Sequence, residues 1–125
     1  MRTAATVLQM LVRLCGLVLI VLGILFWTGN APGLIPVHML LGLVLVISLW
    51  SLAFLAARAG APIAQVVVAI VWGLVVPALG VTQDMLLTGD AHWVIKVLHL
   101  LVGLAAIGMA EGLGRRIKQS PAAAV

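Results

Sequence analysis

The chain has 125 residues, of which 65% are hydrophobic and only 8% are charged. This balance lies far outside the range of water-soluble globular domains and predicts an integral membrane protein. The formal net charge is +4. An anionic lipid surface is a sufficient partner for that charge, so no nucleic-acid partner is expected.

Four apolar runs follow one another along the sequence. Each is close to the roughly 20 residues that a helix needs to cross a bilayer. We predict transmembrane helices at about 4–27, 35–58, 62–87 and 91–117, forming a single domain over residues 1–125. The expected fold is all-α, an integral membrane antiparallel four-helix bundle. Its connections are too short to form a water-soluble domain.

The basic residues predict the orientation of these helices. Arg2, Arg58 and the cluster at 115–118 fall at the N-terminus, in the second loop and at the C-terminus. Four crossings place all of them on one side of the membrane, and basic residues favour the cytoplasmic side. We therefore expect a multi-pass protein of the inner (cytoplasmic) membrane with both termini in the cytoplasm.

Two motifs occur once in each half of the sequence. A pair of glycines seven residues apart is repeated at an offset of 57, and a histidine followed four residues later by glycine is repeated at an offset of 61. The residues are Gly16 and Gly23, Gly73 and Gly80, His38 and Gly42, and His99 and Gly103. We predict two copies of one helical hairpin, at about 1–60 and 61–119, related by a pseudo-twofold axis along the membrane normal. The repeat also favours retention of the first helix over its removal as a signal peptide.

The two repeated histidines are the main functional candidates. An ionisable side chain inside a membrane is costly, so by default it indicates a functional site and a partner. The second and fourth helices run in the same direction and occupy diagonal corners of the bundle, where His38 and His99 face each other across the core. Gly42 and Gly103 lie one turn further on the same faces and leave room for a flat, wide group. With the glycine stripes of the other two helices, the pattern predicts a slot for a porphyrin.

These residues resemble the four-helix haem-binding units of the cytochrome b and cytochrome b561 type. The resemblance rests on the paired His-x-x-x-Gly motifs and the spaced glycines, and it covers most of the four-helix core. It implies one low-spin haem b with His38 and His99 as axial ligands. The function that we expect first is membrane electron transfer, with quinol as one candidate donor and an outer-side acceptor as a candidate partner. Many members of that group hold two haems. This sequence has no second histidine pair on the cytoplasmic half, so a single haem near the periplasmic side is implied.

His92 and Lys96 lie near the outer end of the fourth helix, on the same face as His99. In the favoured interpretation they belong to an interfacial belt, in which Trp93 and Lys96 anchor the helix at the headgroups. In the functional interpretation they form a rim, with Lys96 neutralising a haem propionate and His92 taking a proton as quinol is oxidised.

The depths of the two histidines pose a question. Pro36 is typical of a first helical turn, which puts His38 barely inside its helix. His99 lies about two turns beyond Asp90, the expected N-cap residue. Either the connection before the second helix dips into the protein, or the outer end of the fourth helix projects beyond the core. The alternative pairing joins His38 to His92.

Two other functions remain open. One is a non-catalytic structural or assembly subunit of a larger membrane complex, or a homo-oligomer, with the glycine stripes as helix contacts. The other is a copper or zinc site built from His38, His92, His99 and Met39. The redox partner is not identified by the sequence. Arg13 and Glu111 are expected to form a structural salt bridge or to reach the interface separately.

Overall fold

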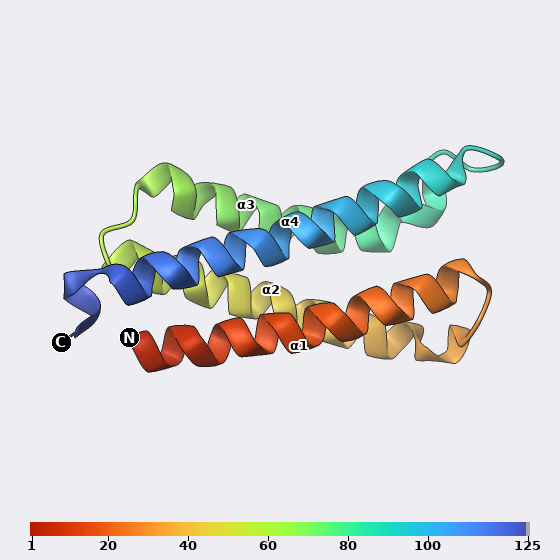
Figure 1. Cartoon of the computed structure of the whole chain (residues 1–125). Helices are drawn as coiled ribbons and strands as arrows, with labels where there is room; N and C mark the ends of the chain where they lie inside the picture. The colour runs from red at the N-terminus through yellow and green to blue at the C-terminus, as the bar shows by residue number, and fades with distance from the viewer. Residues whose placement is uncertain (125) are drawn as a thin grey trace.

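Residues 1–124 are described by the computed structural model, in which four long helices are joined by short loops (Figure 1). The helices are α1 (Arg2–Trp27), α2 (Ile35–Arg58), α3 (Ile63–Thr82) and α4 (His92–Gln119). Short 3₁₀ turns occupy Pro32–Leu34, Gln83–Met85 and Pro121–Ala124. No strand occurs in these residues. The prediction of an all-α chain with four long helices is confirmed.

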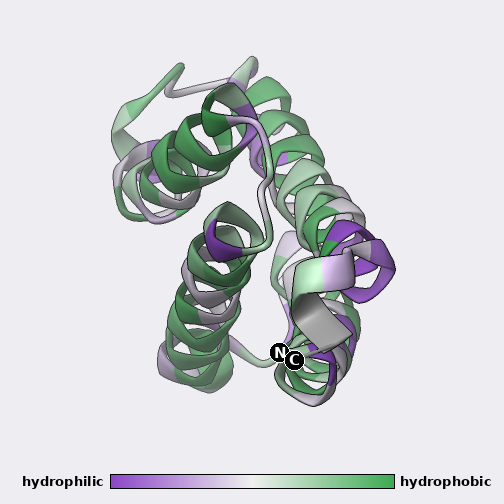
Figure 2. Cartoon of the chain, turned by 90° about the vertical axis from the view of Figure 1, so that its left-hand side faces the viewer, coloured by the Kyte–Doolittle hydropathy of each residue, from purple (hydrophilic) through white to green (hydrophobic). Residues whose placement is uncertain are grey.

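The outside of the four helices is apolar. Each helix is long and apolar enough to cross a membrane. Large apolar side chains remain exposed on the outer faces, among them Leu14 at 63%, Leu40 at 62% and Val81 at 65%. Figure 2 shows apolar residues along the length of the helices and hydrophilic ones near the end that carries the termini. Helices that are apolar on every face are typical of membrane spans, so this surface is consistent with a multi-pass membrane protein.

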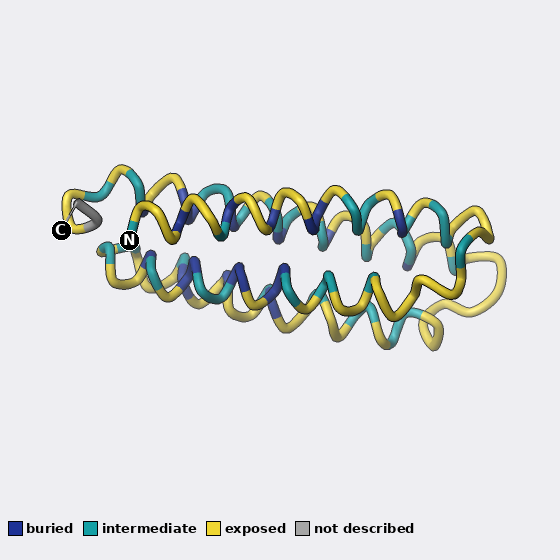
Figure 3. The backbone as a smooth tube through the Cα atoms, turned by 90° about the horizontal axis from the view of Figure 1, so that it is seen from below, coloured by how far each residue is buried: buried dark blue, intermediate teal, exposed yellow. Residues whose placement is uncertain are grey.

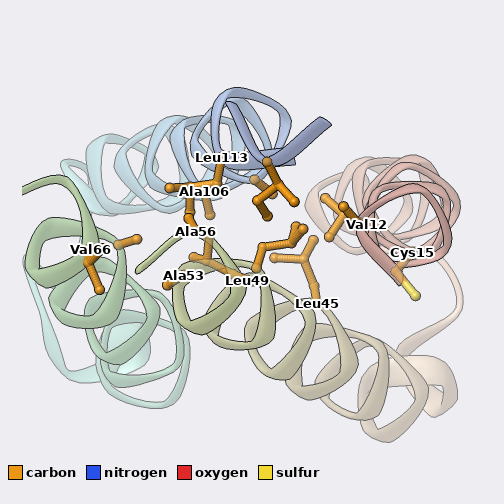
Figure 4. Packing of buried hydrophobic residues seen from close by; sticks show 14 residues of the cluster. Val12, Cys15, Leu45, Leu49, Ala53, Ala56, Val66, Ala106 and Leu113 are labelled. Atoms are coloured by element: carbon orange, nitrogen blue, oxygen red, sulfur yellow. The ribbon is translucent and has the colours of Figure 1, made fainter. Parts of the chain in front are cut away.

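The α2 and α4 helices form the centre of the arrangement. They pack directly against each other, and each also contacts both α1 and α3. Figure 4 shows α1 and α3 on opposite sides of this central pair, with Leu49 and Leu113 in the core between them. The predicted diagonal placement of the second and fourth helices is therefore confirmed. It brings their inward-facing residues together.

Burial is uneven along the bundle. The buried residues gather in the half nearer the termini, whereas the first ten residues of α2, 35–44, contain none (Figure 3). Only a few buried side chains, such as Leu22 and Ile95, lie toward the opposite end. The tightly packed half therefore holds the four helices together, and His38 and His99 lie in the more open half.

The α3–α4 connection differs from its prediction. The third helix was expected to reach residue 87, but α3 ends at Thr82 and a 3₁₀ turn follows. Leu87 and Gly89 have φ angles of 43° and 95°, a left-handed conformation that a continuous right-handed helix does not contain, so no helix continues through residue 87. The expected N-cap, Asp90, is also wrong: the N-cap of α4 is Ala91, and no side chain caps the helix.

Gly73 is a point of close helix packing and supports a stability prediction. A Cβ atom added at Gly73 would clash with the indole of Trp50 on α2, whose Nε1 donates a hydrogen bond to the Ile70 carbonyl at 3.1 Å. Overpacking of this kind costs about 1–3 kcal/mol. We expect Gly73→Ala to lower the melting temperature of the detergent-solubilised protein, measured by circular dichroism.

The control for that experiment is Gly108→Ala. Gly108 is also helical, but nothing lies within 4 Å of an added Cβ atom there. Alanine is the better helix former by up to about 1 kcal/mol, so this variant should melt at the same temperature as the native protein or higher. Equal melting temperatures for the two variants would contradict the packing role of Gly73.

Candidate functional site

His38 and His99 face each other between α2 and α4. Their ring centroids are 6.3 Å apart and the ring planes make an angle of 43°. Both side chains are partly buried. The pair comes from two helices that run in the same direction, so the bundle itself holds the rings together. The predicted proximity of these two side chains is confirmed.

The relative depth of the two histidines follows from where their helices begin. His38 is the fourth residue of α2 and His99 is the eighth of α4. A difference of four residues at a rise of about 1.5 Å each amounts to roughly one helical turn. Because the rings are adjacent, α4 extends about one turn beyond the start of α2. Of the two arrangements considered from the sequence, the projecting fourth helix is the one observed.

A glycine from the preceding helix lies beside each histidine ring. A Cβ atom added at Gly23 of α1 would lie 3.9 Å from Cε1 of His38. A Cβ atom added at Gly80 of α3 would lie 3.2 Å from Cε1 of His99. The second glycine of each stripe therefore lets its helix approach the ring edge closely. The same contact is made in both hairpins.

An aromatic residue that the sequence reasoning missed also contacts the pair. The ring of Phe26, near the end of α1, packs edge-on against His38 with centroids 5.5 Å apart and an interplanar angle of 63°. Phe26 lies three residues after Gly23, so both face α2 from neighbouring positions of one helix side. The three-residue spacing between Gly23 and Phe26 is the feature of the sequence from which this contact could have been predicted. The contact restricts the orientation of the His38 ring.

Each of the two rings has an unsatisfied nitrogen. The Nδ1 atoms of His38 and His99 are buried and have no hydrogen-bond partner among the residues that the structure describes. Buried polar atoms normally have partners, since leaving one unpaired costs roughly 1–3 kcal/mol. The two facing rings thus each leave one buried nitrogen available to a further partner.

The other glycines singled out in the sequence have two different settings. Gly42 and Gly103, one turn beyond the histidines, have open space where a Cβ atom would be. Gly16 instead has the Ile107 side chain of α4 against it, with Cδ1 2.7 Å from an added Cβ atom. Gly73 has the Trp50 indole against it. The first glycine of each stripe thus contacts a packed side chain and not a histidine.

His92 and Lys96 are placed at the outer end of α4. Nδ1 of His92 donates to the Leu86 carbonyl at 3.2 Å, and its Nε2 lies 3.9 Å from a carboxylate oxygen of Asp84. His92 therefore packs against the turn that follows α3 and does not pair with His38. Lys96 is partly buried one turn before His99. It makes no ion pair within the described part of the chain.

Arg13 and Glu111 form an ion pair between α1 and α4, which confirms the salt bridge anticipated from the sequence. Arg13 Nε donates to Glu111 Oε1 at 2.6 Å and Nη2 donates to Oε2 at 2.8 Å. The Gln9 amide, which the sequence reasoning missed, donates to Glu111 Oε2 at 3.0 Å. Gln9 lies one turn before Arg13 on the same face of α1. Its position as a polar residue within an apolar run is the feature of the sequence from which a role in this contact could have been predicted.

A compact metal site with three or more protein ligands is not formed by the described residues. No group of three or more His, Cys, Asp or Glu side chains in residues 1–124 is placed to hold a metal ion. The possible set with His92 as a third ligand is therefore not brought together. Comparison of the chain with protein-family models, curated proteins and solved structures finds no match.

Proposed function

We propose that this chain is a one-haem b-type cytochrome of the inner membrane, with His38 and His99 as the axial ligands of the haem iron. The observation that carries the proposal is the facing of the two rings, 6.3 Å apart, each with a buried nitrogen that lacks a partner. The redox chemistry would come from the haem, which is reduced and reoxidised by one electron. The protein supplies the ligands and their surroundings.

The separation of the rings fits two imidazoles on opposite sides of one metal ion. Two bonds of about 2 Å between a metal ion and an imidazole nitrogen, added to the half-widths of the two rings, bring the ring centroids to a separation of about 6 Å. The rings of His38 and His99 have this separation. Gly42 and Gly103 leave open space one turn along each helix, where a wide planar group needs it. The donor set and the surrounding glycines thus fit the group.

The membrane setting supports the same proposal. The four helices are long and apolar enough to cross a bilayer, and both termini lie at one end (Figure 1). Arg2, Arg58 and the cluster at 115–118 belong to that end, which we assign to the cytoplasm by the distribution of basic residues. The histidine pair then lies in the periplasmic half of an antiparallel membrane bundle.

A repeated hairpin explains the symmetry of the site. In residues 1–60 the helix α1 brings Gly23 against His38, and in residues 61–119 the helix α3 brings Gly80 against His99. Two copies of one hairpin, related by an axis along the membrane normal, would each supply one histidine and one close-packed glycine. We therefore propose that the site arose at the interface of an internal duplication.

The visible spectrum of the purified protein tests the proposal. A chain expressed with sufficient haem should show a sharp reduced α-band after addition of dithionite. The same band should form when haem is added to a colourless preparation, because the ligands are held by packed helices. A folded, helical protein that stays colourless and does not bind added haem would overturn the proposal and favour a structural or assembly role.

The rim at the outer end of α4 leads to a prediction about the electron donor. If quinol reduces the protein from this side, His92 takes a proton released by the quinol, with Lys96 beside it on the same helix face. His92→Ala should keep the haem spectrum but slow reduction by a quinol analogue, measured by stopped-flow absorbance. Leu98→Ala, an exposed position on the same helix, is the control. Unchanged kinetics in His92→Ala would leave His92 with an interfacial role only.

A further inference from the structure

A polar hollow lies at the opposite end of the bundle from the histidines. Its volume is about 550 Å³. The α2–α3 loop, the first turn of α3 and the last turns of α4 form its walls. The lining residues are Ala59, Gly60, Gln65, Gly112, Arg115, Arg116, Gln119 and Ser120. The outer faces of the helices are largely apolar, so this concentration of polar groups around one hollow requires an explanation.

Two arginines make the hollow electropositive. Arg115 and Arg116 are exposed and form no ion pair within the described part of the chain. The nearby carboxylate, Glu111, is held by Arg13 in a two-point contact. Guanidinium groups bind phosphate through paired hydrogen bonds. The two side chains are therefore free to bind an anion that enters the hollow.

Gln65 adds a third polar side chain to the lining of the hollow. It belongs to the first turn of α3, and its Oε1 atom is buried without a hydrogen-bond partner. The amide NH₂ group of this side chain is a hydrogen-bond donor of the kind that binds anions. The Gln65 amide lines the same hollow as the two arginines. A ligand with several acceptor oxygens would satisfy all three side chains.

The walls of the hollow are fixed in position. Ser120 Oγ donates to the Ala59 carbonyl at 2.9 Å, which joins the end of α4 to the α2–α3 loop. Gly60 has a φ angle of 84°, a conformation that glycine adopts readily, so this loop turns sharply beside the hollow. An added Cβ atom at Gly112 would meet nothing within 4 Å, which leaves room next to Arg115 and Arg116. The hollow is thus formed by the folded chain itself.

We propose that this hollow binds the phosphate of an anionic lipid headgroup. The proposal rests on the membrane orientation given above, and not on the haem. In that orientation the hollow lies at the cytoplasmic surface, where lipid headgroups meet the ends of the helices. Basic pockets between transmembrane helices on this side are suited to anionic headgroups. The exposed apolar side chains of Ile63, Val67 and Val68 at the start of α3, next to Gln65, provide a surface for the acyl chains.

Native mass spectrometry of the detergent-solubilised protein tests this proposal. Phosphatidylglycerol is added at increasing concentration, with phosphatidylcholine as the zwitterionic comparison. We expect the native protein to retain phosphatidylglycerol in preference to phosphatidylcholine. The double variant Arg115→Gln/Arg116→Gln should lose about tenfold or more of that affinity, and Gln65→Leu should weaken binding without any change of net charge.

The matched control is Arg2→Gln/Arg58→Gln. It removes the same charge from the same end of the bundle, but neither residue lines the hollow. Equal losses in the two double variants would overturn the proposal in favour of a diffuse surface charge. Displacement of the lipid by millimolar inorganic phosphate would also overturn it, because the site would then bind the free anion. The haem spectrum should be the same in all variants, so failure here is distinguishable from failure of the proposed haem function.

Discussion

Replacing either His38 or His99 by leucine is expected to abolish the reduced α-band of the haem. The two rings are adjacent, with centroids 6.3 Å apart. His38 is the only histidine of α2, and the other histidine of α4, His92, contacts Leu86 and Asp84 instead. Loss of one imidazole removes one axial ligand, and no third histidine is close enough to replace it in the described structure. The measurement is the dithionite-reduced minus oxidised spectrum, with haem content determined separately.

A methionine variant separates a ligand from a packing residue. Methionine has a size similar to leucine but carries a thioether sulfur, which serves as an axial ligand of haem iron in some cytochromes and raises the potential. His99→Met should therefore retain more haem than His99→Leu, with a shifted spectrum and a higher potential. Circular dichroism should report a folded helical bundle in both, since the tightly packed half lies elsewhere.

His92→Leu is the matched control for these substitutions. His92 belongs to the same helix as His99 but contacts Leu86 and Asp84 in the turn after α3. Its replacement should leave the haem spectrum in place. The assignment of His38 and His99 would be wrong if all three leucine variants kept the native spectrum, or if His92→Leu alone lost it.

The four helices could be predicted from the sequence because they depend mainly on one property, the length of each apolar run. An uninterrupted apolar run of sufficient length must form a helix in a bilayer, where every backbone polar group needs an internal partner. The predicted second helix, 35–58, has the observed bounds. The end of α3 was not predictable in this way. Met85, Leu86 and Leu87 are apolar and favour a longer helix, but they follow the polar residues Gln83 and Asp84. The connection there includes the left-handed Leu87 and the contact of His92 with Leu86.

The pairing of His38 with His99 was predicted from the repeat and from helix direction, but its details depend on packing. The positions of Pro36 and Asp90 in the sequence did not determine the relative depth of the two histidines. That depth depends on how α2 packs against α4. The setting of Gly16 and Gly73 also depends on that packing. Their side-chain partners, Ile107 and Trp50, come from helices whose rotation the sequence does not specify. The spacing of the glycines in the sequence identifies the helix face on which they lie, whereas the packing of the helices determines which side chains contact that face.

The ion pair between α1 and α4 leads to the second prediction with a large effect. Glu111→Ala leaves the Arg13 guanidinium without its two-point partner and removes an acceptor from the amide of Gln9, which is only 1% exposed. The Arg13 side chain is 60% exposed on the outside of the bundle, and an unpaired charge facing lipid or detergent at membrane depth is unfavourable. We expect Glu111→Ala to lower the melting temperature by about 5 °C or more, measured by circular dichroism in detergent.

A double variant shows whether the pair stabilises the bundle or only avoids an unpaired charge. Replacing both partners, as in Arg13→Met/Glu111→Leu, removes the charge and fills the space with apolar atoms, an exchange that is often neutral. This variant should therefore melt above Glu111→Ala, while Asp90→Ala, an exposed loop carboxylate, should melt as the native protein does. If the double variant instead loses more than Glu111→Ala, the ion pair itself contributes net stability to the α1–α4 contact. The haem spectrum should be unchanged in every case, because Glu111 lies three turns beyond His99 on α4.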